Sequence, residues 1–238
     1  MRVHAFTKPH LFALNERFLI AGHAADDDAL IAAAERIHAI APELTQFDAQ
    51  VAAAFLLFRD TPADIVLFET GMGGRDDSTN VVRSTLSILT PIALDHQDVL
   101  GPTLADIAAH KAGILKPRTP AITAAQTPEA LAIIEAAALR ANAPLWRQGM
   151  EWDAFANAGR LVVQSEHRTL DLPLPALLGA HQIQNAGLAA AAFLASPFNI
   201  DDDASARGVR AAHWPARLQY FPRNRRRRQS ARRAHRWR

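Results

Sequence analysis

The sequence contains no cysteine among its 238 residues, so disulfide bonds and thiolate metal sites are excluded. It also contains no uncharged apolar run of about 18 residues, so no transmembrane helix is expected. Residues 1–12 lack the long apolar stretch of a secretory signal. These absences are typical of a cytoplasmic protein.

Acidic residues are absent from the last sixteen positions, 223–238, which carry nine arginines. The rest of the chain holds 17 basic and 24 acidic residues, a net charge of −7, although the whole chain is formally +2. Two interpretations of this segment stay open. It is either an electrostatic arm that binds nucleic acid, or the out-of-frame translation of a G/C-rich gene. In both cases it cannot bury apolar surface and is expected to be disordered by itself.

Helix and strand patterns alternate along the chain, which predicts an α/β protein with a mostly parallel sheet. Helices are expected at 26–44, 45–60, 103–115, 127–143, 179–195 and 203–212. Strands are expected at 64–69, 85–90 and 120–125, and the continuous apolar run of the first indicates a strand covered on both faces. Residues 144–172 are short, β-like and rich in turns, which predicts a small antiparallel excursion on the main sheet.

The stretch DIVLFETGMGGRDDSTNVV, residues 64–82, ends an apolar strand on Glu69 and follows it with three glycines. In parallel α/β sheets, ligands bind beyond the carboxyl ends of the strands. A carboxylate there commonly holds Mg²⁺ near a nucleotide phosphate, and glycines let the backbone approach a ligand closely. A turn-rich loop in which Glu69 pairs with Arg75 is the alternative.

Two common glycine motifs are incomplete in this chain. The dinucleotide fingerprint G-x-G-x-x-G fails because Asp76 stands where the third glycine belongs. The phosphate-binding loop G-x-x-x-x-G-K-[ST] does not occur anywhere in the sequence. The glycine-rich stretch therefore needs another explanation.

Three further segments carry polar residues at suitable places. His96 follows a strand-like run, and a histidine there is either a structural hydrogen bonder or a metal ligand. Lys111 lies within a predicted helix, where most lysines are solvated surface charges. At 179–195, His181 and Asn185 either cap the helix or contact a ligand.

These segments together resemble one family. ETGMGGRDDSTNVV resembles the E-x-G-x-G-G-R-x-D-x-T-N signature of the folylpolyglutamate synthases and dihydrofolate synthases of the Mur ligase superfamily. PIALDHQDVLGPTLADIAAHKAGILKP resembles the family's next motif. TKPHLFALNERFLIAG, LLGAHQIQNAGLAAAA and WPARLQ resemble further motifs in the same order, so the resemblance covers about residues 5–221.

The resemblance implies an ATP-dependent ligase that joins L-glutamate to dihydropteroate or folate through an acyl phosphate. It implies ATP as a substrate, Mg²⁺ as a cofactor and a typically monomeric enzyme. The implied fold is a central ATP-binding domain of three layers, with helices on both faces of the sheet. Positioning and charge neutralisation around the transferred phosphoryl group supply most of such catalysis.

The resemblance also assigns roles to residues. Glu69 matches a Mg²⁺ ligand, and His96 matches a ligand of a second Mg²⁺ in the catalytic centre. Lys111 matches a catalytic lysine that family members carry carbamylated, and carbamylation would turn it into an anionic oxygen ligand.

Four other positions match substrate contacts. Asn185 and Arg217 match nucleotide-contacting positions. Phe47 and Asp77 match positions near the pterin, where an aromatic face and a hydrogen-bond acceptor suit the ring.

The chain departs from the family pattern. It begins at the T-S-P-H-L-like segment, so the Walker A loop and the P-loop strand are expected to be absent, and with them the amides that cradle phosphates. We therefore expect residues 1–221 to form a partial central domain, followed by the Arg-rich tail at 222–238, without the C-terminal ligase domain. Lys8, Asp76 and Ala216 replace the serine, leucine and glycine usual in the family.

Two rival functions stay open. One is a non-enzymatic nucleic-acid-binding protein that uses the Arg-rich tail. The other is a remnant that holds folate without chemistry.

We expect negligible ligase turnover from residues 1–238 by themselves, because the phosphate-cradling amides and the closing domain are not among them. The measurement is phosphate release with ATP, L-glutamate and dihydropteroate. A rate like that of an intact family member would contradict the expectation.

Overall fold

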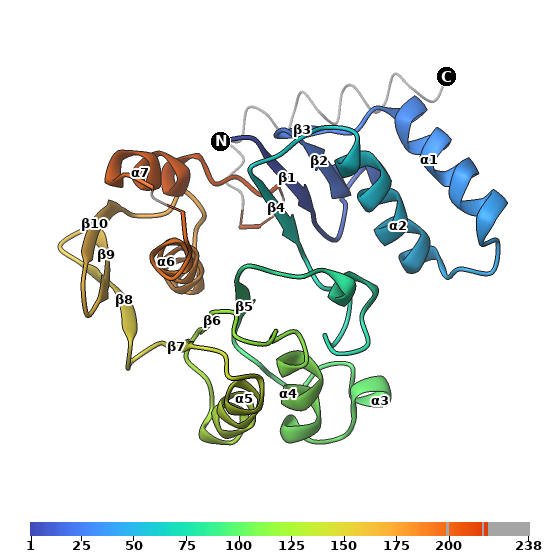
Figure 1. The fold of residues 1–238 in the computed structure, drawn as a ribbon. Coiled ribbons are helices and arrows are strands. Elements are labelled where there is room, and N and C mark those ends of the chain that lie inside the picture. Colours follow the sequence, from blue (N-terminus) through green and yellow to red (C-terminus); the bar gives the residue numbers. More distant parts are fainter. Residues whose placement is uncertain (199, 216, 219–238) are drawn as a thin grey trace, which may run out of the picture. The chain divides into compact units, whose positions relative to one another are not determined.

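The computed structural model describes residues 1–198, 200–215 and 217–218 (Figure 1). The predicted Arg-rich tail lies outside these residues, as does Ala216. The chain divides into two compact units, Met1–Arg147 and Gln148–Arg238. Among the described residues, no helix has the length and apolar character needed to cross a membrane.

The first unit begins with a mixed four-stranded sheet. Its strands are β1 (Val3–Phe6), β2 (Phe18–Ile20), β3 (His23–Ala24) and β4 (Ile65–Phe68), in the order β3-β2-β1-β4. Strand β4 pairs with β1 in parallel, from Val3 opposite Ile65 to Phe6 opposite Phe68, whereas β2 and β3 pair antiparallel. A 3₁₀ turn, η1 (Leu14–Arg17), precedes β2.

Helices α1 (Asp27–Ile40) and α2 (Gln46–Arg59) belong to the same half of the unit and contact each other (Figure 1). The Thr45 side chain caps α2 by accepting the Asp48 N–H, which satisfies one of the free amides of the first turn. One apolar core joins these helices to the strands. Its aromatic centre is Phe6, whose ring centroid lies 5.4 Å from that of Phe18 and 6.2 Å from that of Phe68.

A second, parallel sheet completes the first unit. Strands β5 (Ser87–Leu89), β6 (Ala121–Thr123) and β7 (Leu145–Arg147) lie in that order. The turn η2 (Ser78–Val81) precedes β5, α3 (Gln97–Leu100) and α4 (Leu104–Ala112) lie between β5 and β6, and α5 (Pro128–Ala141) lies between β6 and β7. Helices α4 and α5 pack on each other around a separate core that contains Leu89, Ile107 and Ile134.

The described residues of the second unit form an antiparallel meander and two helices. Strands β8 (Trp152–Asn157), β9 (Arg160–Ser165) and β10 (Thr169–Pro173) pair in sequence order. Helix α6 (Ala180–Leu194) packs on β8 and β9, and α7 (Asp202–Ala211) contacts β10 (Figure 1). Gly187 lets α6 approach β8, because a Cβ at that position would overlap the Ala154 side chain.

The α/β class is confirmed, and each predicted helix is present within a few residues of its expected bounds. The described strands form three sheets, so the excursion is not built on one main sheet. Residues 145–147 were expected in that excursion but pair with β6 in parallel, because a helix, α5, separates β7 from β6 as in other parallel crossovers.

The expectation that strand 64–69 is covered on both faces was wrong for the described residues. Val66 is 44% exposed and Leu67 is 51% exposed. Successive residues of a strand point to opposite faces, so both faces of β4 are partly uncovered in the described residues. Among the described strands, β4 also pairs only with β1 and is therefore an edge strand.

Replacing Gly187 with alanine should destabilise the second unit. The added methyl group would overlap the Ala154 side chain, and overpacking of this kind costs about 1–3 kcal/mol. The measurement is the midpoint of urea unfolding. Gly208→Ala in α7 is the matched control, since a Cβ there meets nothing within 4 Å, and it should be neutral or slightly stabilising. Equal midpoints for the two variants would contradict the close packing.

Candidate functional site

The site is organised around the loop that follows β4, residues 69–81. Glu69 lies at the start of this loop, and its N–H donates to the Phe6 carbonyl at 2.9 Å, which extends the β1–β4 pairing by one residue. Its side chain is exposed, and Oε2 accepts the Lys8 N–H at 2.9 Å. The alternative pairing with Arg75 is not what the structure shows, because the Arg75 Nη2 lies 3.1 Å from the Asp76 Oδ2 instead.

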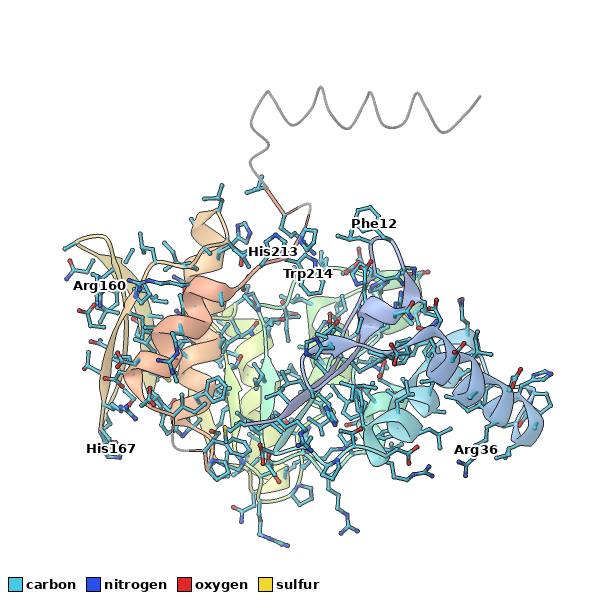
Figure 2. The ribbon with its side chains drawn as sticks, turned by 90° about the horizontal axis from the view of Figure 1, so that it is seen from above. Phe12, Arg36, Arg160, His167, His213 and Trp214 are labelled. Atoms are coloured by element: carbon cyan, nitrogen blue, oxygen red, sulfur yellow. The ribbon has the colours of Figure 1, made fainter. Side chains whose placement is uncertain are left out.

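The segment between β1 and η1 is held beside Glu69 by that Lys8 contact. At its other end, the N–H groups of Leu11, Phe12 and Ala13 donate to the Glu16 carboxylate at 2.7–3.0 Å. The hydrogen bond from Leu11 is the largest of the effects that lower the pKa of this exposed carboxyl. Phe12 projects away from the strands and is 88% exposed (Figure 2).

Gly71 lies next to both residues that were predicted to contact the pterin, Phe47 and Asp77. A Cβ at this position would overlap the Phe47 ring and would lie 2.8 Å from the Asp77 Oδ2. Only a glycine therefore lets the loop pass between the first turn of α2 and Asp77.

Asp77 closes the loop on itself. Its Oδ1 accepts from the Thr79 N–H at 3.0 Å and from the Thr79 hydroxyl at 2.5 Å, and Oδ2 accepts from the Met72 N–H at 2.9 Å. A carboxylate offers about four acceptor positions, so three are already in use. The sequence did not indicate this structural role.

One side of the loop is tied to α2. The Ser78 hydroxyl donates to the Asp48 carboxylate, which also accepts from the Thr45 hydroxyl at 2.6 Å. The Ser78 hydrogen bond, followed by that of Thr45, lowers the pKa of the half-buried Asp48 carboxyl.

The other side of the loop is tied to the end of α4. The Asn80 Nδ2 donates to the carbonyls of Arg75 at 3.0 Å and Gly113 at 3.1 Å. The Lys116 Nζ donates to the Asn80 carbonyl at 2.6 Å and to its Oδ1 at 2.7 Å. The Arg75 N–H also donates to the His110 carbonyl at 2.8 Å. These contacts seat the glycines on the last turn of α4.

Lys111, in that last turn, has its backbone against the glycine loop. A Cβ on Gly74 would lie 3.0 Å from the Lys111 carbonyl oxygen. The Lys111 side chain is half-buried and has no hydrogen bond or ion pair with the described residues. Its backbone therefore belongs to the loop assembly while its Nζ stays available.

His96 occupies the turn that begins α3. Its backbone is left-handed, with φ of 52°, and its N–H donates to the Asp95 Oδ1 at 2.9 Å. Its ring is exposed, with Nε2 at 3.5 Å from the Asp95 Oδ2. The glycine loop touches α3 at Leu100, whose Cδ2 would lie 2.9 Å from a Cβ on Gly73.

The two predicted nucleotide contacts lie in the second unit. The Asn185 Nδ2, in α6, donates to the Gln182 Oε1 at 3.3 Å. Arg217 lies after α7, and its N–H donates to the Trp214 carbonyl at 3.4 Å. The described residues contain no group of three or more His, Asp or Glu side chains that could hold a metal ion. The predicted metal set includes only two such residues, because its third member is a lysine.

Sequence reasoning did not assign roles to four side chains that hold the loop: Asp48, Ser78, Asn80 and Lys116. Two signals were available. Thr45-x-x-Asp48 is a helix-capping pattern, and Asn80 closes the signature quoted above. Neither pattern indicates which distant residue the side chain contacts.

No protein-family model matches the chain. Solved structures do. A structure of Escherichia coli FolC in complex with DHPP and ADP superposes with a TM-score of 0.86 at 34% identity, covering 93% of this chain and 53% of that one. A bifunctional folylpolyglutamate synthase/dihydrofolate synthase with Mn, AMPPNP and L-glutamate bound gives 0.83 at 32% identity, with coverage of 93% and 53%. These structural neighbours are α/β proteins of the Mur-ligase-like class.

A curated relative narrows the assignment. The dihydrofolate synthase/folylpolyglutamate synthase of Bacillus subtilis is 35% identical over 235 residues, which cover 91% of this chain and 55% of the relative. This chain is a homologue of the dihydrofolate synthase/folylpolyglutamate synthases. It spans about half the length of the curated relatives that it matches.

Asp48→Ala should destabilise the first unit in a pH-dependent way. Hydrogen bonds to a charged group contribute about 1.5–3 kcal/mol, so the urea midpoint should fall near neutral pH. Because the folded pKa lies below the ordinary 3.8, this contribution is present above 3.8 and is lost as the pH falls through the folded pKa. The difference in urea midpoint between Asp48→Ala and the unaltered chain should therefore become smaller as the pH is lowered into the acid range.

The matched control is Glu35→Ala on the exposed face of α1. Its urea midpoint is expected to differ little from that of the unaltered chain, by the same amount at each pH. A difference for Asp48→Ala that stays constant into acid would contradict the role given to its carboxylate.

Proposed function

We propose that this chain carries part of the active site of an ATP-dependent ligase that joins L-glutamate to dihydropteroate or folate. The reaction proceeds through an acyl phosphate on the pteroate or folate carboxylate, which the amine of glutamate attacks as phosphate leaves. The enzyme acts in the cytoplasm and as a monomer. A three-layer arrangement with a mostly parallel sheet belongs to the same proposal, supported by the parallel pairings of β4 and of β5 to β7.

The observation that carries the proposal is the position of the glycine loop. The loop passes beside Phe47 and Asp77 at Gly71, and three residues further on Gly74 lies on the Lys111 backbone. Homologues at 34% and 32% identity were solved with DHPP and ADP and with Mn, AMPPNP and L-glutamate. Those ligands are the classes of molecule that the proposed reaction uses.

The donor chemistry of the predicted ligands suits a divalent metal. Glu69 has an exposed carboxylate, of which only Oε2 is engaged among the described residues, and the His96 ring is exposed. Lys111, once carbamylated, would add an oxygen ligand of the kind that Mg²⁺ prefers. We propose that Glu69, His96 and Lys111 hold Mg²⁺ in this way. Such a metal neutralises charge on the transferred phosphoryl group.

The remaining site residues have separate tasks in the proposal. The Arg217 guanidinium and the Asn185 amide contact the nucleotide, since a guanidinium pairs well with phosphate oxygens. The Phe47 ring packs on the pterin, and the acceptor position left on Asp77 receives a pterin N–H. Phe47 already lies 6.0 Å from Phe6 between ring centroids, so the core holds its ring in place.

Calorimetric titration with dihydropteroate, in the presence of ADP and Mg²⁺, tests the binding part of the proposal. Saturable heat is expected from the unaltered chain. Gly71→Ala should weaken it at least several-fold, because the added methyl group overlaps the Phe47 ring. Gly208→Ala in α7 is the control, since a Cβ there meets nothing within 4 Å and the backbone is not left-handed. A folded chain that gives no heat at high ligand concentration would rule out a pterin site on these residues.

A further inference from the structure

We propose that Asn80 and Lys116 are positioning residues that lock the glycine loop onto the end of α4. The lock sets where Lys111 stands relative to the loop that begins at Glu69. This inference rests on the proposed function and deepens it, because it names residues that prepare the metal-binding groups without touching the ligand themselves.

The Asn80 side chain connects two segments that are far apart in the sequence. Both hydrogens of its Nδ2 have acceptors, one on the loop at the Arg75 carbonyl and one after α4 at the Gly113 carbonyl. A single planar amide thus spans the loop and the helix end. A side chain without two donors on one nitrogen could not make both contacts.

Lys116 completes the lock from the opposite side. Its ammonium donates to two oxygens of the same residue, the Asn80 carbonyl and the Asn80 Oδ1. Hydrogen bonds from a charged donor are stronger than those between neutral groups. Burial lowers the pKa of Lys116, so its charged form carries a desolvation cost at this position.

The glycines need such a lock because they have no side chains of their own to hold them. Close backbone approaches occur on both sides of the contact: a Cβ on Gly74 would lie 2.8 Å from the His110 carbonyl oxygen, and a Cβ on Gly113 would overlap the Arg75 side chain. A small shift of the loop would therefore separate it from the Lys111 backbone.

Hydrogen exchange tests the lock directly. In Lys116→Met and Asn80→Leu, amide exchange across residues 71–81 should rise at least tenfold, while residues 128–141 of α5 stay protected as in the unaltered chain. Lys116→Arg keeps the charge and should restore most of the protection. Arg118→Met removes a nearby exposed charge and serves as the control. Unchanged exchange in the loop of both altered chains would overturn the proposal.

A metal titration separates positioning from simple stability. Mn²⁺ binding in the presence of ADP is followed by electron paramagnetic resonance, with each variant kept well below its melting temperature. Loss of residues that orient metal ligands commonly lowers metal affinity about 10–100-fold, and we expect a loss of that order for Lys116→Met, with recovery in Lys116→Arg.

The outcomes are distinguishable. Equal Mn²⁺ affinity in the unaltered chain and in Lys116→Met would overturn the positioning role alone. A folded, unaltered chain that binds no Mn²⁺ would overturn the proposed function and this role with it. A loss of affinity that Lys116→Arg does not recover would also count against the lock, because the charge-assisted contacts would then not be what matters.

Discussion

The first unit depends on one loop that forms hydrogen bonds to the elements of two separate apolar cores. One core includes side chains of α2 and β1, and the other includes side chains of α4 and α5. Residues 69–81 reach the first core through Ser78 and Asp48, and the second through Asn80, Gly113 and Lys116. The two cores have no buried residue in common. The polar contacts of the loop therefore connect them at the candidate site.

The carboxylates of the site divide between structure and function according to their surroundings. Asp48 accepts hydrogen bonds from the hydroxyls of Thr45 and Ser78, and Asp77 accepts from donors within the loop. Glu69 accepts one backbone N–H and keeps the rest of its carboxylate exposed. The group proposed to meet a metal is thus the one that the fold leaves least occupied.

The structure shows what two departures from the family pattern, Lys8 and Asp76, change in the contacts of the loop. Lys8 stands in place of a serine, but the atom that contacts Glu69 is its backbone nitrogen, which any residue except proline supplies. Asp76 stands in place of a leucine; it forms an exposed ion pair with Arg75 at 3.1 Å and lies 3.4 Å from the Nδ1 of the half-buried His110. Exposed ion pairs of this kind contribute little to stability, so this change leaves the loop anchors as the dominant contacts.

Local patterns in the sequence determined the α/β class, the helices and the family, because periodicity, caps and motif spacing are properties of neighbouring residues. Thr127 and Pro128 at the start of α5, for example, are sufficient to indicate where that helix begins. Strands β1 to β3 were not predicted, because the segment that contains them shows neither a continuous apolar run nor a clear alternation of apolar and polar residues.

Only the tertiary structure decided which strands pair, and in which direction, as the parallel pairing of β7 illustrates. It also decided the partners of the site. Glu69, His96 and Lys111 could be selected from motifs, but the contact between Asn80 and Lys116 joins residues 36 positions apart. Such a hydrogen bond exists only after two packed cores have brought the residues together, so no local pattern in the sequence encodes it.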